Sequence, residues 1–410
     1  METTAHDHAL TTNQKWTIAS TSAGFALENM DVLFLSFALS SIIAELHISG
    51  AQAGLISSIT NLGMLAGGIL FGVIADRFGR VKTFSHTVFI FAIATALMYF
   101  ASNIYLIYGC RFLAGVGAGG EYGVGITLIA ENFKHKNIGK MTSIAAIGGQ
   151  IGAILAAICA SVIIPTLGWR ALFLFGLIPV VLTYFIRRHL HESDEFIAAK
   201  NAVKDPRKRV RISALFKTPQ LAYQSVALMV MVIVQIAGYF GLMNWLPSIM
   251  QQKLGLSVSG SSLWMIATIV GMSIGMMTFG SILDYFGPRR AFGIFLLCSA
   301  VSVFGITLTF NEITLLFAGA ILGFFSNGMF GGYGAVISRL YPTEVRSTAN
   351  NVIVNVGRAI GGFSSVVIGF LMDRYSLIVV MGFLAVLYVI SFITMLTIPS
   401  LHKLGQVNEG

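Results

Sequence analysis

The sequence predicts an all-α membrane protein with twelve transmembrane helices in two pseudo-symmetric six-helix bundles. Of its 410 residues, 56% are hydrophobic and 10% are charged, whereas a soluble chain carries about 25% charged residues. Five runs contain no Asp, Glu, Lys or Arg, and each exceeds the roughly 20 residues that cross a bilayer as a helix. Helices are required because a backbone in lipid must satisfy its polar groups within the segment. The runs are 46–75, 141–169, 254–283, 313–338 and 375–401.

The distribution of basic residues predicts the topology. Of the 26 Lys and Arg residues, two lie inside predicted spans, three lie in loops on one side of the membrane, and the other 21 lie on the opposite side. Because cytoplasmic loops are enriched in basic residues, we expect a multi-pass cell-membrane protein with both termini in the cytoplasm. The net charge of +9 therefore reports topology and does not indicate nucleic-acid binding. The twelve spans are predicted near 17–41, 51–75, 83–102, 105–130, 141–164, 169–186, 221–247, 258–283, 291–310, 313–338, 348–371 and 376–399.

The chain also contains an internal repeat. When the sequence is shifted by 208 residues, Gly63, Gly67, Gly72, Asp76 and Gly79 fall on Gly271, Gly275, Gly280, Asp284 and Gly287. The second and third spans therefore recur as the eighth and ninth. A polar connector with a basic run at 207–211 separates the copies, and we interpret it as a solvated linker. The predicted units are an N-terminal bundle at 1–188, a cytoplasmic linker at 189–220 and a C-terminal bundle at 221–410.

Two segments with the same pattern follow the second and eighth spans. They read Gly72-Val73-Ile74-Ala75-Asp76-Arg77-Phe78-Gly79-Arg80-Val81-Lys82 and Gly280-Ser281-Ile282-Leu283-Asp284-Tyr285-Phe286-Gly287-Pro288-Arg289-Arg290. This pattern resembles the signature of the major facilitator superfamily, at the expected position in each half. The resemblance covers essentially the whole chain. It implies the fold of that family and secondary transport by alternating access.

In that family the motif holds the halves together while the carrier faces outward. Asp76 ends the second span close to the predicted start of the eleventh, at Ser347 or Thr348. A helix N-terminus stabilises a nearby carboxylate by about 0.3–1 kcal/mol. Pro288 replaces a basic residue in the second copy, so we expect that copy to be mainly structural. The predicted gating residues are Gly72, Asp76, Arg77, Gly79, Arg80, Glu131, Asp284, Gly287 and Arg339.

Five ionisable residues lie inside predicted spans: Glu28, Asp31, Arg111, Glu121 and Arg358. Each costs at least about 2.5–3.5 kcal/mol at membrane depth, which marks a functional position. Asp31 and Arg111 differ in depth by roughly one helical turn, and sugar-carrying members of the family pair an acid and an arginine at these positions. We therefore predict an Asp31–Arg111 ion pair that takes part in proton coupling. The alternative is that this pair is a fixed structural salt bridge. Proton coupling is assigned to Asp31, Glu28, Arg111 and Glu121.

A second set of polar residues predicts where a substrate binds. An arginine such as Arg358, predicted to lack a partner, requires an anion or a water-filled cavity. Its counterpart at the 208-residue offset is Gln150, so we expect the two to face each other. Single polar side chains can instead join helices to one another. The candidate substrate-binding residues are Arg111, Tyr122, Gln150, Gln235, Tyr239, Asn327, Asn355 and Arg358.

Three stretches narrow the substrate class: 111–123, 168–173 and 341–346. They resemble the organic-acid:proton symporter branch of the superfamily, which includes sialate, lactate, nicotinate and aromatic-acid carriers. The resemblance implies a monomer that binds protons, a small anionic substrate and the lipid bilayer. The alternatives are a sugar or polyol proton symporter and a drug/proton antiporter. No intramembrane histidine cluster or nucleophile–base pair indicates an enzyme, and we expect neither a cofactor nor a metal.

Overall fold

The computed structural model describes residues 10–48, 50–133, 137–202, 212–254, 258–364, 367–368, 371 and 374–406. Its regular elements are helical throughout these ranges. The basic run 207–211 of the linker lies outside the described residues. The N-terminal half contains α1 (Thr12–Leu46), α2 (Gly50–Phe78), α3 (Arg80–Leu97) with η1 (Met98–Phe100), α4 (Ile104–Asn132), α5 (Ile138–Leu167), α6 (Trp169–Phe173), η3 (Leu174–Leu177) and α7 (Ile178–His189).

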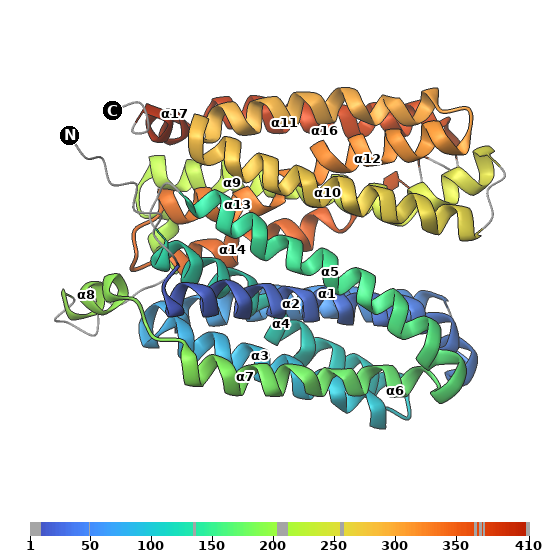
Figure 1. Cartoon of the computed structure of the whole chain (residues 1–410), viewed down its shortest axis with the longest axis horizontal. Coiled ribbons are helices and arrows are strands. Elements are labelled where there is room, and N and C mark those ends of the chain that lie inside the picture. Colours follow the sequence, from blue (N-terminus) through green and yellow to red (C-terminus); the bar gives the residue numbers. More distant parts are fainter. Residues whose placement is uncertain are drawn as a thin grey trace.

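The linker contributes α8 (Asp194–Ala202) and η5 (Ile212–Phe216). The C-terminal half contains α9 (Pro219–Leu254), α10 (Val258–Phe286), α11 (Pro288–Ser302) with η6 (Val303–Leu308), α12 (Glu312–Gly328), α13 (Phe330–Leu340), α14 (Arg346–Gly361), α16 (Leu377–Leu396) and α17 (Pro399–Gln406). The two halves lie side by side, and α8 projects beyond the helices at the end where α17 lies (Figure 1). Within the described residues, each of the twelve predicted spans overlaps a helix or a run of consecutive helices, although α14 ends at Gly361, before the predicted end of the eleventh span at 371.

Nine helices among the described residues are long and apolar enough to cross a membrane. The three remaining predicted spans correspond to α1, to the run α6–η3–α7 and to α14. The first and third of these have polar sequences, because α1 carries Glu28 and Asp31 and α14 carries three asparagines and Arg358. The sixth span, predicted as one helix, is interrupted by the 3-10 turn η3 before Pro179 opens α7. The tenth is divided at Met329 into α12 and α13.

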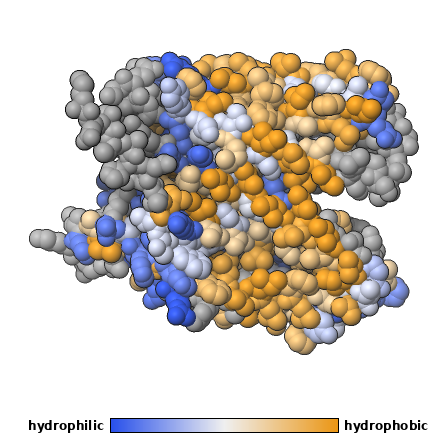
Figure 2. All heavy atoms as spheres, viewed as in Figure 1, coloured by the Kyte–Doolittle hydropathy of each residue, from blue (hydrophilic) through white to orange (hydrophobic). Residues whose placement is uncertain are grey.

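The exposed surface matches a membrane protein. Apolar side chains form a band that runs across both halves in the view of Figure 2, and hydrophilic residues gather at the end where α8 lies. Large hydrophobic residues such as Phe317, Leu62 and Val162 are more than half exposed. Exposed apolar surface on this scale requires a lipid solvent rather than water.

Glycine contacts repeat between the halves at the 208-residue offset. A Cβ added at Gly63 would collide with the carbonyl oxygen of Phe112, and one added at Gly271 would collide with that of Ala320. Both pairs of residues are related by the same offset. Helices α2 and α4 therefore pack as α10 and α12 do, because small residues let the backbones approach closely. The duplication predicted from the sequence is present in the packing.

Candidate functional site

The first intramembrane ion pair joins α1 and α4 within the N-terminal half. Arg111 donates from Nη1 to both carboxylate oxygens of Asp31, at 2.8 and 2.7 Å, and its Nε lies 3.4 Å from the hydroxyl of Thr60. The Arg111 side chain is 1% exposed and that of Asp31 is 5% exposed. The predicted ion pair is confirmed, and it is enclosed by the helices of one half.

The second ion pair joins the two halves. Arg358 on α14 donates from Nη1 to a carboxylate oxygen of Glu28 on α1 at 2.8 Å. The expectation that Arg358 lacks an acidic partner is therefore wrong. Its guanidinium also lies 5.1 Å from the ring centre of Tyr122. The Arg358 side chain is 15% exposed, so it is more accessible than that of Arg111.

Glu121 on α4 is a buried acid without a partner among the described residues. Its side chain is 0% exposed, and neither carboxylate oxygen has a hydrogen bond. A Cβ added at Gly24 of α1 would collide with the Glu121 carboxylate. The ring of the neighbouring Tyr122 stacks on Phe25 at 5.1 Å. An isolated ionised carboxylate is far more costly to bury than a neutral one, so this burial favours the neutral form of Glu121.

Of the remaining predicted substrate-binding residues, some join helices within one half and Asn355 joins the two halves. Gln235 on α9 donates to Asn327 on α12 at 2.9 Å, which ties two helices of the C-terminal half. Asn355 on α14 donates to the carbonyl of Gly119 on α4, also at 2.9 Å, and so joins the halves. Buried oxygens of Gln235 and Asn355 have no hydrogen bond from the described residues. Gln150 is buried on α5, and Tyr239 on α9 is half-buried.

The first motif copy connects the halves at the end near α8. Asp76 accepts hydrogen bonds from the backbone N–H groups of Ser347 and Thr348, at 3.2 and 2.7 Å, where α14 begins. Arg80 lies 3.0 Å from Asp76 and donates to Glu131 at 3.0 Å. The placement predicted for Asp76, at the start of the eleventh span, is confirmed. Gly72 contributes by letting α2 approach α14 closely, because a Cβ there would lie 2.9 Å from the Cα of Thr348.

The second motif copy makes the same kind of contact. Asp284 accepts from the backbone N–H groups of Gly139 and Lys140, at 2.9 and 2.8 Å, where α5 begins. Arg339 donates to the same carboxylate. Proline at the start of α11 leaves these Asp284 contacts intact, and the mainly structural role expected for this copy stays a prediction. Each half thus presents one aspartate to a helix N-terminus of the other half.

The backbone of each motif turns at a glycine. Gly79 has φ +134° and Gly287 has φ +82°, a region that side chains disfavour. Each glycine immediately precedes the next helix, α3 or α11. The half-buried Arg77 lies in the last turn of α2.

The start of the linker binds the first motif, which the sequence interpretation missed. Glu192 accepts from the backbone N–H groups of Arg80 and the following residue, at 2.9 and 3.0 Å. Ser193 donates to Glu131 at 2.8 Å, and the ring of Phe196 lies 4.0 Å from the Arg80 guanidinium. This part of the linker is docked rather than solvated. The signal in the sequence was a serine followed by acidic residues at the start of α8, which is typical of a helix N-terminus.

The model of the Major Facilitator Superfamily matches residues 21–274 and 228–408. A Haemophilus influenzae protein, whose assignment to metabolite transport is provisional, is 37% identical over 94% of this chain and 96% of its own. The cis,cis-muconate transport protein of Acinetobacter baylyi is 29% identical over 90% of this chain and 91% of its own. Other relatives are named as transporters of niacin, sialic acid and benzoate.

Solved structures support the same fold. The proton:xylose symporter XylE, bound to 6-bromo-6-deoxy-D-glucose, superposes with a TM-score of 0.80. The match covers 94% of this chain and 96% of that one at 17% identity, which establishes the shared fold alone.

Proposed function

The chain belongs to the Major Facilitator Superfamily, and on that premise we propose that it carries a small organic carboxylate together with protons. Membership makes it a multi-pass membrane transporter and not an enzyme. The organic-anion character of its relatives supports the carboxylate class, since the names include muconate, niacin, sialic acid and benzoate. Symport and the identity of the substrate-binding residues are the parts that this proposal adds.

The observation that carries the proposal is the Glu28–Arg358 ion pair between the halves. A guanidinium presents a planar fork of donors that matches a carboxylate. Arg358 already binds one carboxylate at 2.8 Å. A substrate carboxylate can therefore replace that of Glu28 and keep the charge of Arg358 paired. Because Arg358 is the more exposed of the two intramembrane arginines, it is the one that a substrate reaches.

The same exchange couples substrate to protons. Once a substrate takes Arg358, Glu28 is a carboxylate without a cation in a low-dielectric interior. Such a group is costly unless it binds a proton. Asp31, held by Arg111, and Glu121, which has no partner among the described residues, are the other proton carriers that we propose. Anion and proton then enter together.

Gating follows from the two motif aspartates. Alternating access requires the halves to separate at the end where Asp76 and Asp284 now join them. We propose that these contacts hold the protein closed at that end. They break when the halves rock to open it.

We expect Asp76→Asn to favour the state that is open at the α8 end. The substitution removes a charge that binds the α14 N-terminus, where such an interaction contributes up to about 2 kcal/mol, or roughly 30-fold in population. The measurement is reaction of Ser143→Cys with an impermeant maleimide, after the three native cysteines are replaced by serine. Ser143 is fully buried against Gly331 of α13. Labelling should accelerate severalfold, whereas Asp194→Asn on the exposed side of α8 should leave it unchanged. An unaltered rate in Asp76→Asn would contradict the gate.

Uptake into proteoliposomes with an imposed pH gradient tests the function. The panel contains benzoate, nicotinate, muconate, sialate and lactate, a set of neutral sugars, and cationic drugs. We expect an acidic exterior to drive accumulation of at least one carboxylate, and a protonophore to abolish it. Accumulation of a sugar without any carboxylate, or expulsion of a drug, would contradict the proposal.

A further inference from the structure

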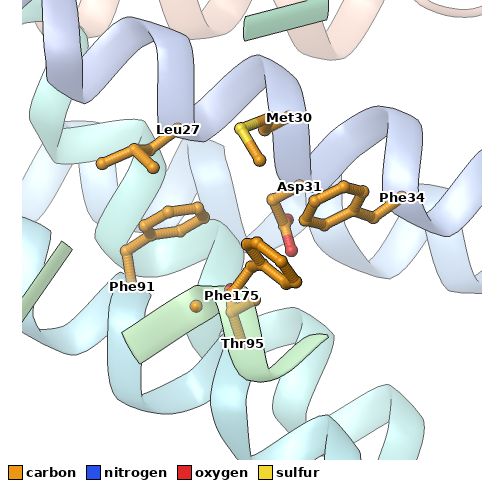
Figure 3. Close-up of a pocket in the computed structure, with 8 residues that line it drawn as sticks. Leu27, Met30, Asp31, Phe34, Phe91, Thr95 and Phe175 are labelled. Carbon is orange, nitrogen blue, oxygen red and sulfur yellow. The ribbon is translucent and has the colours of Figure 1, made fainter. Parts of the chain in front are cut away.

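A small cavity lies beside Asp31, inside the N-terminal half and apart from the Arg358 pair. It is lined by residues of α1, α3 and η3, with Phe34, Phe91 and Phe175 among its walls (Figure 3). The space for the centre of a water-sized sphere is about 10 Å³. That volume corresponds to about one water molecule.

Two polar groups line this otherwise apolar cavity. One is the carboxylate of Asp31, which Arg111 binds through a single nitrogen. The other is Thr95, which is 1% exposed and whose hydroxyl has no hydrogen bond among the described residues. In Figure 3 both side chains extend from their helices into the same region. Burying a hydroxyl without a partner is unfavourable, so the cavity contains an unmet donor and unused carboxylate lone pairs.

Thr95 differs from the other described threonines of α3. Thr83 and Thr87 both donate to carbonyl oxygens of their own helix, those of Gly79 and Phe84, at 2.7 and 2.8 Å. This is the usual solution for a threonine within a helix. The Thr95 hydroxyl makes no such bond to a described residue, which leaves it available to a molecule in the cavity.

We propose that this cavity holds one water molecule, bound by Asp31 and Thr95, through which Asp31 exchanges its proton. This inference rests on the proposed proton coupling. The water passes a proton to a carboxylate oxygen of Asp31 and receives one from solvent, so no other reactant is needed. Thr95 lies about 9 Å along the helix axis from the chain turn at Ala101, at the end opposite α8. Protons thus reach Asp31 through the N-terminal half, while the substrate binds between the halves.

The charged surroundings of Asp31 agree with a separate route. Arg111 faces it from α4, and Glu28, three residues earlier on α1, is bound to Arg358. From α2 the neighbour is the uncharged Thr60. The cavity-lining residues of α3 and η3 include no titratable side chain. A water molecule in this cavity is therefore the partner with which Asp31 could exchange a proton on the α3 and η3 side.

Thr95→Val tests the route, because it removes the hydroxyl while keeping the size and branching of the side chain. We expect proton-driven accumulation of the carboxylate to slow about tenfold, the scale of one lost hydrogen bond. Substrate counterflow, which needs no net proton transfer, should remain at the wild-type rate. Thr87→Val, on the same helix and outside the cavity, should change neither rate. Unchanged accumulation in Thr95→Val, or equal loss of accumulation and counterflow, would overturn the route.

A second measurement detects the water without transport. X-ray radiolysis converts bound water to hydroxyl radicals, which oxidise adjacent methionine even when it is buried. Met30 lines the cavity and is 7% exposed, whereas Met98 is fully buried and does not line it. We expect rapid oxidation of Met30 in the wild type, severalfold slower oxidation in Thr95→Val, and little at Met98 in either protein. Equal Met30 oxidation in the two proteins would disprove the water site even if carboxylate symport holds. The predicted contrast would establish the site even if symport fails.

Discussion

Arg358→Gln should reduce carboxylate uptake by about 30-fold or more. Truncating one member of a buried, hydrogen-bonded charge pair costs about 2–5 kcal/mol, and each 1.4 kcal/mol corresponds to a factor of ten. The loss should appear in the substrate affinity, measured by binding to the purified protein, as well as in the uptake rate. Arg358→Lys keeps the positive charge but loses the planar set of guanidinium donors. Its substrate affinity and uptake rate should lie between those of Arg358→Gln and the wild type.

This substitution alone leaves Glu28 without its cation, which can destabilise the fold independently of the substrate. The double variant Glu28→Gln/Arg358→Gln removes both charges and is the matched control. We expect it to recover thermal stability close to that of the wild type and still fail to bind the carboxylate. Carboxylate binding by the double variant at wild-type affinity would remove Arg358 from the substrate site.

Asp31→Asn should uncouple transport from the pH gradient. Asparagine has the size of aspartate and can still accept from Arg111, yet it cannot carry a proton at this position. Accumulation against a concentration gradient should therefore fall to the equilibrium level, while substrate counterflow continues at a rate near that of the wild type. Both quantities are measured in the same proteoliposomes.

Glu45→Gln is the control for this second prediction. Glu45 lies at the C-terminal end of α1, where its half-exposed side chain pairs with Arg170. The substitution has the same chemistry and should leave coupling intact. Persistent proton-driven accumulation in Asp31→Asn would assign coupling to Glu28 or Glu121 instead.

Much of the fold could be predicted because its causes are local. A run of about 20 apolar residues is a span whatever surrounds it, and the basic loops indicate topology in the same way. The motif placed Asp76 near the start of α14, and helical rise placed Asp31 within roughly one turn of Arg111 in depth. Both contacts are present at hydrogen-bond distance. In each case, counting residues along a helix was sufficient to place the side chain.

The contacts that were missed depend on how separate helices pack. Glu28 and Asp31 are three residues apart on α1, yet one binds Arg358 across the halves and the other binds Arg111 within one half. Residues 330 positions apart in the chain meet in the first pair. The docking of Glu192 onto α3, and the contact of Asp284 with α5, also required the halves and the linker to be placed in space.

The sequence by itself therefore determined that this chain crosses the membrane repeatedly as a duplicated unit, and which few charges enter it. The tertiary structure decided which charge meets which. Transfer free energy depends on the composition of each segment, whereas an ion pair depends on the rotation of two helices about their axes and on the distance between them.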